Sequence, residues 1–254
     1  MKKLVFIGSS MKERLELYKQ VTKDLSLQGL LHWCFETFGY DKIIFASSMG
    51  LEDQMLTHLL AQDHTSARVL TLDTGRNFQE TYDVMHETMR RFGIRYEVYA
   101  PSAHDIETLI QQNGPNLFYD SMQDRKQCCY VRKIKPLQRA LSTVDAWMTG
   151  LRKQQSVTRT DLDIISWDDQ FNIFKINPLL HYTYDQVWDY VKTHNVPYNT
   201  LHDHNFFSIG CAPCTRAVKS GEDFRSGRWW WEKPEHKECG LHDHKTKKGG
   251  KGDS

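Results

Sequence analysis

Short apolar runs recur along this chain, each closed by polar or turn-forming residues. The runs occupy residues 41–46, 68–73, 95–100, 144–150 and 171–176. Continuous apolar runs of this length, rich in Ile, Val and Phe, are typical of strands buried on both faces. The pattern therefore predicts five strands in the interior of one sheet.

Longer stretches with helical spacing lie between these runs. The clearest are residues 51–61 and 77–91, and the first 40 residues also read as helical, with Leu15, Tyr18, Val21 and Leu25 near helical spacing. Strands that alternate with helices predict an α/β fold, a mostly parallel sheet flanked by helices on both faces.

The character of the sequence changes near Asn199. The segment that follows is rich in His, Gly, Cys and Trp and has little periodicity. It predicts loops and short helices over the carboxyl edge of the sheet. We expect one domain over residues 1–235 and an irregular, mobile tail over residues 236–254, because the end of the chain is dominated by Gly and Lys.

Composition narrows the class of protein. Of 254 residues, 39% are hydrophobic and 26% charged, which is typical of a globular protein, and the formal net charge of +1 predicts no nucleic-acid partner. No apolar stretch approaches the ~20 residues of a membrane span. The apolar run at residues 4–7 is too short for a secretory signal, so six cysteines predict a cytoplasmic protein whose thiols serve metals or catalysis.

Two cysteine pairs, Cys128-Cys129 and Cys211-x-x-Cys214, carry the strongest chemical signal. Structural zinc usually takes each pair of ligands from a C-x₂₋₄-C turn. Adjacent cysteines point their side chains apart, which suits an extended body such as a [4Fe–4S] cluster better. Zinc, a disulfide and unmetallated core thiols remain open alternatives. Cys34 lies in an apolar stretch and is expected in the core.

Two predicted strands end in turns that are suited to anions. Residues 47–53 read Ser-Ser-Met-Gly-Leu-Glu-Asp between a strand and a helix, and residues 73–75 read Asp-Thr-Gly after the next strand. Backbone N–H groups at such a helix N-terminus bind phosphates, although an ordinary capped turn would look similar. Adjacent turns at the carboxyl edge of a parallel sheet form a ligand crevice.

Basic residues gather near these features. Lys133 follows the first cysteine pair, Arg152 follows the fourth strand, and Arg225 and Arg228 follow the second cysteine pair. Arginine clamps multi-oxygen anions through two parallel hydrogen bonds, so several that converge would bind a nucleotide with two acidic groups. The alternative for each of them is solvated surface charge.

The last cysteine, Cys239, has polar and flexible neighbours, which indicates an accessible nucleophile rather than a core residue. Two His-Asp-His triplets, at residues 202–204 and 242–244, resemble metal-ligand spacing, but we expect surface histidines. The run of three tryptophans at residues 229–231 is expected to pack the C-terminal segment onto the domain.

Together these motifs resemble the assimilatory sulfonucleotide reductases, and specifically the iron–sulfur adenylyl-sulfate (APS) reductases. The resemblance covers residues 45–242 and rests on the ordered motifs Ser-Ser-x-Gly-x-Glu-Asp, Leu-Asp-Thr-Gly-Arg, Cys-Cys-x-x-Arg-Lys, Thr-Gly-x-Arg, Cys-x-x-Cys-Thr-Arg, Arg-x-x-Arg-Trp-Trp and Glu-Cys-Gly-Leu-His. It implies an adenine-nucleotide α-hydrolase-like fold, related to the ATP pyrophosphatases. Reductases of the 3′-phosphorylated nucleotide (PAPS) typically lack both cysteine pairs, so the resemblance implies APS as substrate and leaves PAPS as the alternative.

The resemblance also implies roles for individual residues. Cys239 would attack the sulfur of the nucleotide, with His242 as an orienting group. The cluster ligands would be Cys128, Cys129, Cys211 and Cys214. The residues implied in substrate binding are Ser47, Ser48, Gly50, Glu52, Asp53, Asp73, Thr74, Gly75, Lys133, Arg152, Arg225 and Arg228. The resemblance implies thioredoxin as the reductant, with glutaredoxin as the alternative, and assembly into a homo-oligomer stays open.

Two rival readings remain. The first is an adenylyltransferase on the same fold, although the turn at residues 47–53 lacks the second glycine typical of that class. The second is an iron–sulfur redox sensor with a relic nucleotide pocket, which would not need the additional thiol of Cys239.

Overall fold

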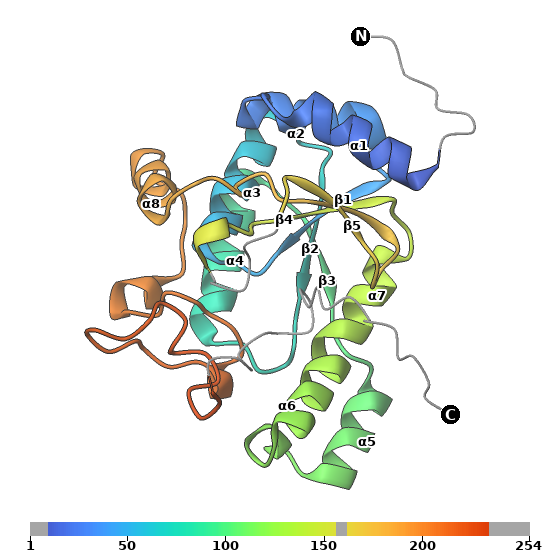
Figure 1. The fold of residues 1–254 in the computed structure, drawn as a ribbon. Coiled ribbons are helices and arrows are strands. Elements are labelled where there is room, and N and C mark those ends of the chain that lie inside the picture. The colour runs from blue at the N-terminus through green and yellow to red at the C-terminus, as the bar shows by residue number, and fades with distance from the viewer. Residues whose placement is uncertain (1–9, 156–161, 234–254) are drawn as a thin grey trace.

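The structure, a computed structural model, describes residues 10–155 and 162–233 and is built around one six-stranded sheet (Figure 1). The strand order is β3-β2-β1-β4-β6-β5. All neighbours are parallel except β5 and β6, which are antiparallel. The strands are β1 (Ile43–Ser47), β2 (Arg68–Leu72), β3 (Tyr96–Tyr99), β4 (Ala146–Thr149), β5 (Ile165–Asp168) and β6 (Ile173–Ile176).

The described residues form eight α-helices around the sheet. They are α1 (Met11–Thr22), α2 (Leu27–Phe38), α3 (Leu51–Asp63), α4 (Gln79–Phe92), α5 (Ala103–Asn113), α6 (Met122–Cys129), α7 (Lys135–Leu141) and α8 (Tyr184–Thr193). In Figure 1, α1 and α2 lie at the opposite end of the molecule from α5 and α6. None of the helices in the described segments is long and apolar enough to span a membrane.

The central strand β1 shows why the sheet is covered on both faces. Successive side chains of a strand point to opposite faces. Ile43 and Phe45 pack in the larger core, formed with α2, α3 and α8, whereas Ile44 packs in a second core against α7. Because both faces are buried, β1 reads as a continuous apolar run rather than as an alternating one.

The structure confirms the mostly parallel α/β sheet and all five expected strands. Cys34 is fully buried in the larger core, as expected. The edge strand β5 was not predicted, because residues 165–168 read Ile-Ser-Trp-Asp and form no long apolar run. Pairing with β6 stabilises this strand.

The helical spacing of apolar residues from Leu15 to Leu25 does not correspond to one helix. The helix α1 ends at Thr22, and Ser26 caps a separate helix α2 by accepting a hydrogen bond from the N–H of Gly29. Val21 and Leu25 are therefore exposed, whereas Tyr18 is buried against Trp33.

The strand order creates a switch point beside β1. The chain moves from β1 to β2 and β3 in one direction, and then crosses over to place β4 on the other side of β1. The switch point therefore lies at the carboxyl ends of β1 and β4. Open α/β sheets bind their ligands at such a point.

Candidate active site

A large open cleft lies at this switch point. Its volume is about 1460 Å³ including the open mouth, and its walls come from the loops after β1, β2 and β4 and from the segment beyond α8. Nine of the residues predicted from the sequence line it: Ser47, Ser48, Gly50, Glu52, Asp53, Thr74, Lys133, Arg225 and Arg228. The sequence could not show whether the basic residues lie together. Three of the four, Lys133, Arg225 and Arg228, line this one cleft.

The turn after β1 is held in shape by Asp53. Its Oδ2 accepts hydrogen bonds from the backbone N–H of Ser48 at 2.6 Å and from the hydroxyl of Ser48 at 2.7 Å. Gly50, the N-cap of α3, makes no side-chain cap bond, so the positive end of that helix opens at the cleft. This geometry suits an anion.

Burial raises the pKa of the Asp53 carboxyl to about 6, although the hydrogen bonds from Ser48 oppose the shift. The folded state therefore binds a proton more tightly than the unfolded state does, and stability falls as pH rises between the two pKa values. We expect the free energy of unfolding of Asp53→Asn, relative to that of wild type, to rise by at most about 3 kcal/mol when the pH is raised from 4 to 7. Urea denaturation of both proteins at three pH values measures this difference, and a constant difference would contradict it.

The loop after β4 meets this turn at Gly150. A Cβ at this position would lie 2.2 Å from Asp53 Oδ1 and 3.1 Å from the Cβ of Glu52. Only glycine allows this close approach, because the Asp53 carboxylate is buried and held by Ser48. The two loops thus form one continuous wall of the cleft.

Three residues predicted to bind substrate do not line the cleft. Asp73 accepts hydrogen bonds from the N–H of Gly75 and from the hydroxyl of Tyr82, both at 2.8 Å, and so shapes its own loop. Gly75 adopts a positive φ of 68° in that loop. Arg152 is buried behind the wall, where its Nε donates to Glu52 at 2.7 Å.

The four cysteines of the two pairs line one small cavity beside the cleft, about 300 Å³ with the space open to solvent included. Cys128, Cys211 and Cys214 are buried around Trp229, and Cys129 is half-buried. All five cysteines of the described segments are free thiols, so no disulfide forms among them. Those segments also hold no group of three or more His, Cys, Asp or Glu side chains arranged around a single ion.

A π-helical turn, Tyr130–Ile134, joins α6 to α7 directly after the adjacent cysteines. Pro136 explains its position, because proline lacks the N–H that an α-helix would use and its ring crowds the carbonyl four residues earlier. The wider turn carries Lys133, which lines both the cysteine cavity and the cleft. Such turns are frequent at functional sites.

Basic side chains line the cysteine cavity, and among them only Lys133 was predicted as a site residue from the sequence. Arg76, Arg125 and Arg132 line it together with Lys133. Arg132 donates to the carbonyl of Thr74 at 2.7 Å, and the Sγ of Cys211 donates to the hydroxyl of Thr74 at 3.3 Å. The loop after β2 thus connects both cysteine pairs.

Burial raises the pKa of the Cys214 thiol to about 12 and also raises that of Cys128. The nearby cations oppose the shift: Arg228 and Lys133 at Cys214, and Arg132 at Cys128. Metal ligands must be thiolates, and cations at this range stabilise thiolates. The cavity therefore offers four sulfurs in a positive environment.

The loop between Cys214 and Trp229 carries Arg225 and Arg228 to the cleft. Its two ends pair at Thr215 and Arg228, and the N–H of Trp229 donates to the carbonyl of Cys214 at 3.1 Å. The ring of Trp229 lies between Arg125 and Arg228, whose guanidinium carbons are 4.5 and 4.7 Å from its centre. As expected, Trp229 packs the C-terminal segment onto the domain, and Trp231 packs beside it, whereas Trp230 is exposed.

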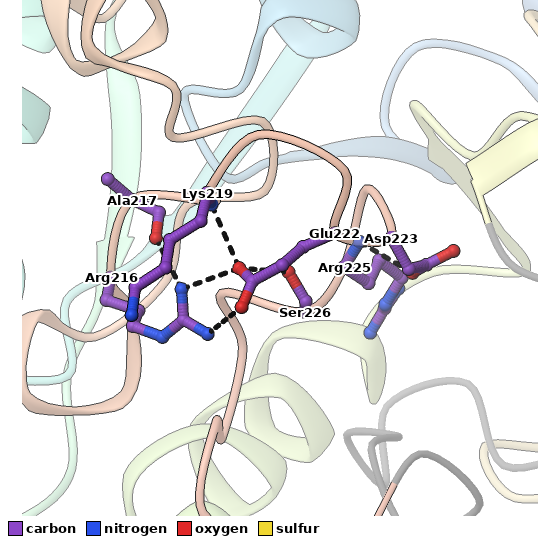
Figure 2. Close-up of polar contacts among 7 residues, drawn as sticks. All are labelled: Arg216, Ala217, Lys219, Glu222, Asp223, Arg225 and Ser226. Carbon is purple, nitrogen blue, oxygen red and sulfur yellow. Dashed lines mark hydrogen bonds and ion pairs between the residues drawn. The ribbon is translucent and has the colours of Figure 1, made fainter.

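Glu222 organises the tip of this loop (Figure 2). Its two carboxylate oxygens accept hydrogen bonds of 2.8 Å from the guanidinium of Arg216. The same carboxylate accepts from the N–H of Lys219 at 2.9 Å and from the hydroxyl of Ser226 at 3.1 Å. These bonds hold the pKa of Glu222 near 2 and fix the backbone next to Arg225.

Two further features of the cleft were not predicted from the sequence. Gly210 approaches Arg228 so closely that a Cβ there would overlap the guanidinium, and the motif Ser-Ile-Gly before Cys211 is its sequence signal. His202 was expected at the surface, but it is 7% exposed and lines the cleft. That expectation was wrong, because the turn Thr200–His204 packs His202 inward beside Trp188. Cys239 and His242 lie outside the described residues.

Comparison with known proteins agrees with this architecture. Residues 42–217 match the phosphoadenosine phosphosulfate reductase domain. The adenosine 5′-phosphosulfate reductase of Allochromatium vinosum is 49% identical over 202 residues, which are 80% of this chain and 79% of that protein.

Solved structures extend the comparison to the fold. A phosphoadenylyl-sulfate (PAPS) reductase from Candida auris, in complex with phosphate, superposes with a TM-score of 0.71 and 26% identity, over 84% of this chain and 99% of that one. The Candida glabrata FMN adenylyltransferase, with FAD and pyrophosphate bound, superposes with a TM-score of 0.53 and 14% identity, over 87% of this chain and 73% of that one. The second likeness shows the fold alone. With a family match over most of its length and a relative nearly half identical, this chain belongs to the phosphoadenosine phosphosulfate reductase family.

Proposed function

We propose that this enzyme reduces adenylyl sulfate to sulfite and AMP in sulfate assimilation. The observation that most directly supports this proposal is that Lys133 lines both the cleft at the switch point and the cavity of four cysteines. A nucleotide cleft with converging cations supports a sulfonucleotide substrate. The relatives that match most of the chain, from Allochromatium vinosum and Burkholderia cepacia at 49% and 44% identity, are both named adenosine 5′-phosphosulfate reductase.

Cys128, Cys129, Cys211 and Cys214 would hold a [4Fe–4S] cluster. The residues fit this group, because four buried or half-buried thiols line one cavity among cations. The adjacent cysteines lie on a helix, where successive side chains diverge by about 100°. Zinc fits this geometry less well. When bound, the cluster would tie the two cysteine segments together beside Lys133.

The protein prepares the substrate through charge and shape. The open N-terminus of α3 and the cations Lys133, Arg225 and Arg228 offer positive potential to the phosphosulfate. That potential offsets the repulsion between an anionic nucleophile and an anionic substrate. Arg152, held by Glu52, would stiffen the wall at Gly150.

The chemical step would use Cys239, which follows the domain in sequence. Its thiolate attacks the sulfur of the phosphosulfate; an S–S bond forms, the S–O bond breaks, and AMP leaves with the electron pair. A dithiol reductant of the thioredoxin type then attacks Cys239 Sγ and expels sulfite. The second thiol of the reductant attacks the mixed disulfide and releases the Cys239 thiol. This chemistry needs a reducing compartment, so we place the enzyme in the cytoplasm.

The test is sulfite release from APS and from PAPS, with thioredoxin as reductant and protein purified without oxygen. We expect strong preference for APS. Comparable activity on PAPS would support the sulfonucleotide chemistry but contradict the link between the cysteine pairs and APS. Sulfite from neither nucleotide would overturn the proposal and favour a sensor, whereas AMP transfer from ATP would favour the adenylyltransferase whose fold this chain shares.

Replacing Cys214 by alanine tests the cluster site. We expect purified Cys214→Ala to lose most of its iron, acid-labile sulfide and visible absorbance, because a buried ligand is removed from the set. The matched control is Cys34→Ala, which changes another buried cysteine that packs in a different core cluster. If Cys214→Ala retained full iron, Cys214 would not be a ligand.

Replacing Glu222 by glutamine tests the loop that carries Arg225. We expect KM for the nucleotide to rise about 3- to 10-fold with kcat nearly unchanged, because the loop loses its paired contact with Arg216 and positions Arg225 less well. Glu87→Gln is the matched control, since Glu87 makes the same paired contact with Arg90 on the exposed face of α4. Equal kinetics for the two variants would contradict the role of Glu222.

A further inference from the structure

His202 is a buried, titratable side chain of the cleft that this mechanism leaves unused. It belongs to a short helical turn, Thr200–His204, whose start is capped by Asn199 through a 3.0 Å hydrogen bond from the N–H of Leu201. The N–H of His202 itself donates to the carbonyl of Asn199 at 3.0 Å. The backbone position of His202 is therefore fixed, and its ring forms part of the cleft wall.

Neither ring nitrogen of His202 makes a hydrogen bond of good geometry with the described residues, although the backbone of Phe206 lies close enough to raise its pKa. Only 7% of the residue is exposed. Buried polar groups are normally paired, and an unpaired one is costly. His58 shows the usual arrangement, because it is equally buried but its Nδ1 is 2.9 Å from the hydroxyl of Tyr190. A ring that stays unpaired in the wall of a ligand cleft indicates that the ligand supplies the partner.

The surroundings of His202 favour a neutral partner. Burial lowers its pKa, so the ring is neutral at pH 7 and offers one donor and one acceptor. The charges that act on it are the carboxylates of Glu52 and Asp203, whereas the cations of the cleft are carried by other segments. A neutral imidazole whose charged neighbours are carboxylates pairs with a neutral donor or acceptor more favourably than with an anion.

Aromatic side chains lie on the side of the cleft that His202 lines. His202 lies edge-on to Trp188, with ring centres 6.1 Å apart, and Trp188 contacts Tyr184 in turn. Tyr184 contacts both Phe207 and Phe224, which stack on each other at 5.1 Å and line the cleft. Aromatic walls with a few polar groups are typical of sites that bind flat, uncharged ring systems.

We infer that His202 binds the nucleoside part of the nucleotide, through a hydrogen bond between its imidazole and a hydroxyl or ring nitrogen of that nucleoside. This inference rests on the proposed function, which supplies the adenosine nucleotide. It divides the cleft into a cationic side around Lys133, Arg225 and Arg228, and a neutral side around His202.

The experiment compares AMP and adenosine as ligands of His202→Phe by calorimetry. Phenylalanine keeps a ring beside Trp188 but has no hydrogen-bonding atom. We expect both ligands to bind about 10-fold more weakly, because a hydrogen bond to a neutral group of the ligand is lost. His58→Phe is the matched control and should bind both ligands like wild type. In turnover, KM should rise with kcat nearly unchanged.

Two outcomes would overturn the inference: unchanged affinity for both ligands, or a loss confined to AMP, which would place the contact at the phosphate. If His202→Phe does not fold, His202→Gln is measured with the same expectation of weaker binding. The ring nitrogen NMR shifts of wild-type His202 should also change when adenosine binds. Wild-type protein that releases no sulfite would contradict the proposed function separately, whatever the binding result.

Discussion

Replacing Cys239 by serine is expected to abolish sulfite release, with activity reduced at least about 10⁴-fold. A serine hydroxyl is not ionised at neutral pH and cannot form the S–S bond that holds the sulfonate. The four cysteines of the cavity and the residues of the cleft are unchanged in this variant, so iron content and AMP affinity should match wild type. Sulfite release, iron analysis and AMP calorimetry measure these three quantities.

The intermediate gives this prediction a second readout. Wild-type protein mixed with APS, without a thiol reductant, should gain the mass of one sulfonate group on the peptide that contains Cys239. Cys239→Ser should gain nothing, and adding thioredoxin should reverse the gain in wild type. Continued turnover by the serine variant, or a sulfonate on another cysteine, would show that Cys239 is not the nucleophile.

Replacing Arg228 by alanine is expected to lower kcat/KM by about 10²- to 10³-fold, the range found when a charged group aimed at the reacting anion is removed. Arg228 is only 6% exposed, lines the cleft and lies against the ring of Trp229. Lysine should restore only part of the activity, because it lacks the planar guanidinium that stacks and bonds with two N–H groups.

The control for this prediction is Arg90→Ala, which removes an exposed arginine from α4 and should leave kcat/KM unchanged. Gly210→Ala offers an independent check. A Cβ at Gly210 would displace the guanidinium of Arg228 without removing its charge, so the loss should resemble that of Arg228→Ala. Full activity in Arg228→Ala would mean that Lys133 and Arg225 suffice for the anion.

The sequence was most informative where one local signal decides the structure. The strand β1 is a short apolar run, and its burial on both faces requires little more than that pattern. It was least informative where distant contacts decide. The edge strand β5 exists because β6 lies beside it, and α1 ends at Thr22 although apolar residues continue to Leu25.

The candidate site divides in the same way. The two cysteine pairs and the turn before α3 are local motifs, and the structure places each beside a cavity. The sequence identified candidate arginines but could not show which of them reach the cleft. Arg225 and Arg228 line it, whereas Arg152 does not and instead donates to Glu52 from behind the wall. No local pattern distinguishes these cases, because the distinction depends on which loops meet at the switch point.

By itself the sequence determined the alternation of strands and helices, the thiols available to a metal, and the glycine and serine turn at the N-terminus of α3. These depend on residues close together in the chain, whose hydrophobic period and side-chain chemistry act locally. The tertiary structure alone decided that β4 lies beside β1, that Lys133 is shared by two cavities, and that the ring of His202 is buried with no well-formed hydrogen bond to the described residues. Those features arise from packing between segments far apart in the chain, where burial and charge are set by neighbours that local sequence does not specify.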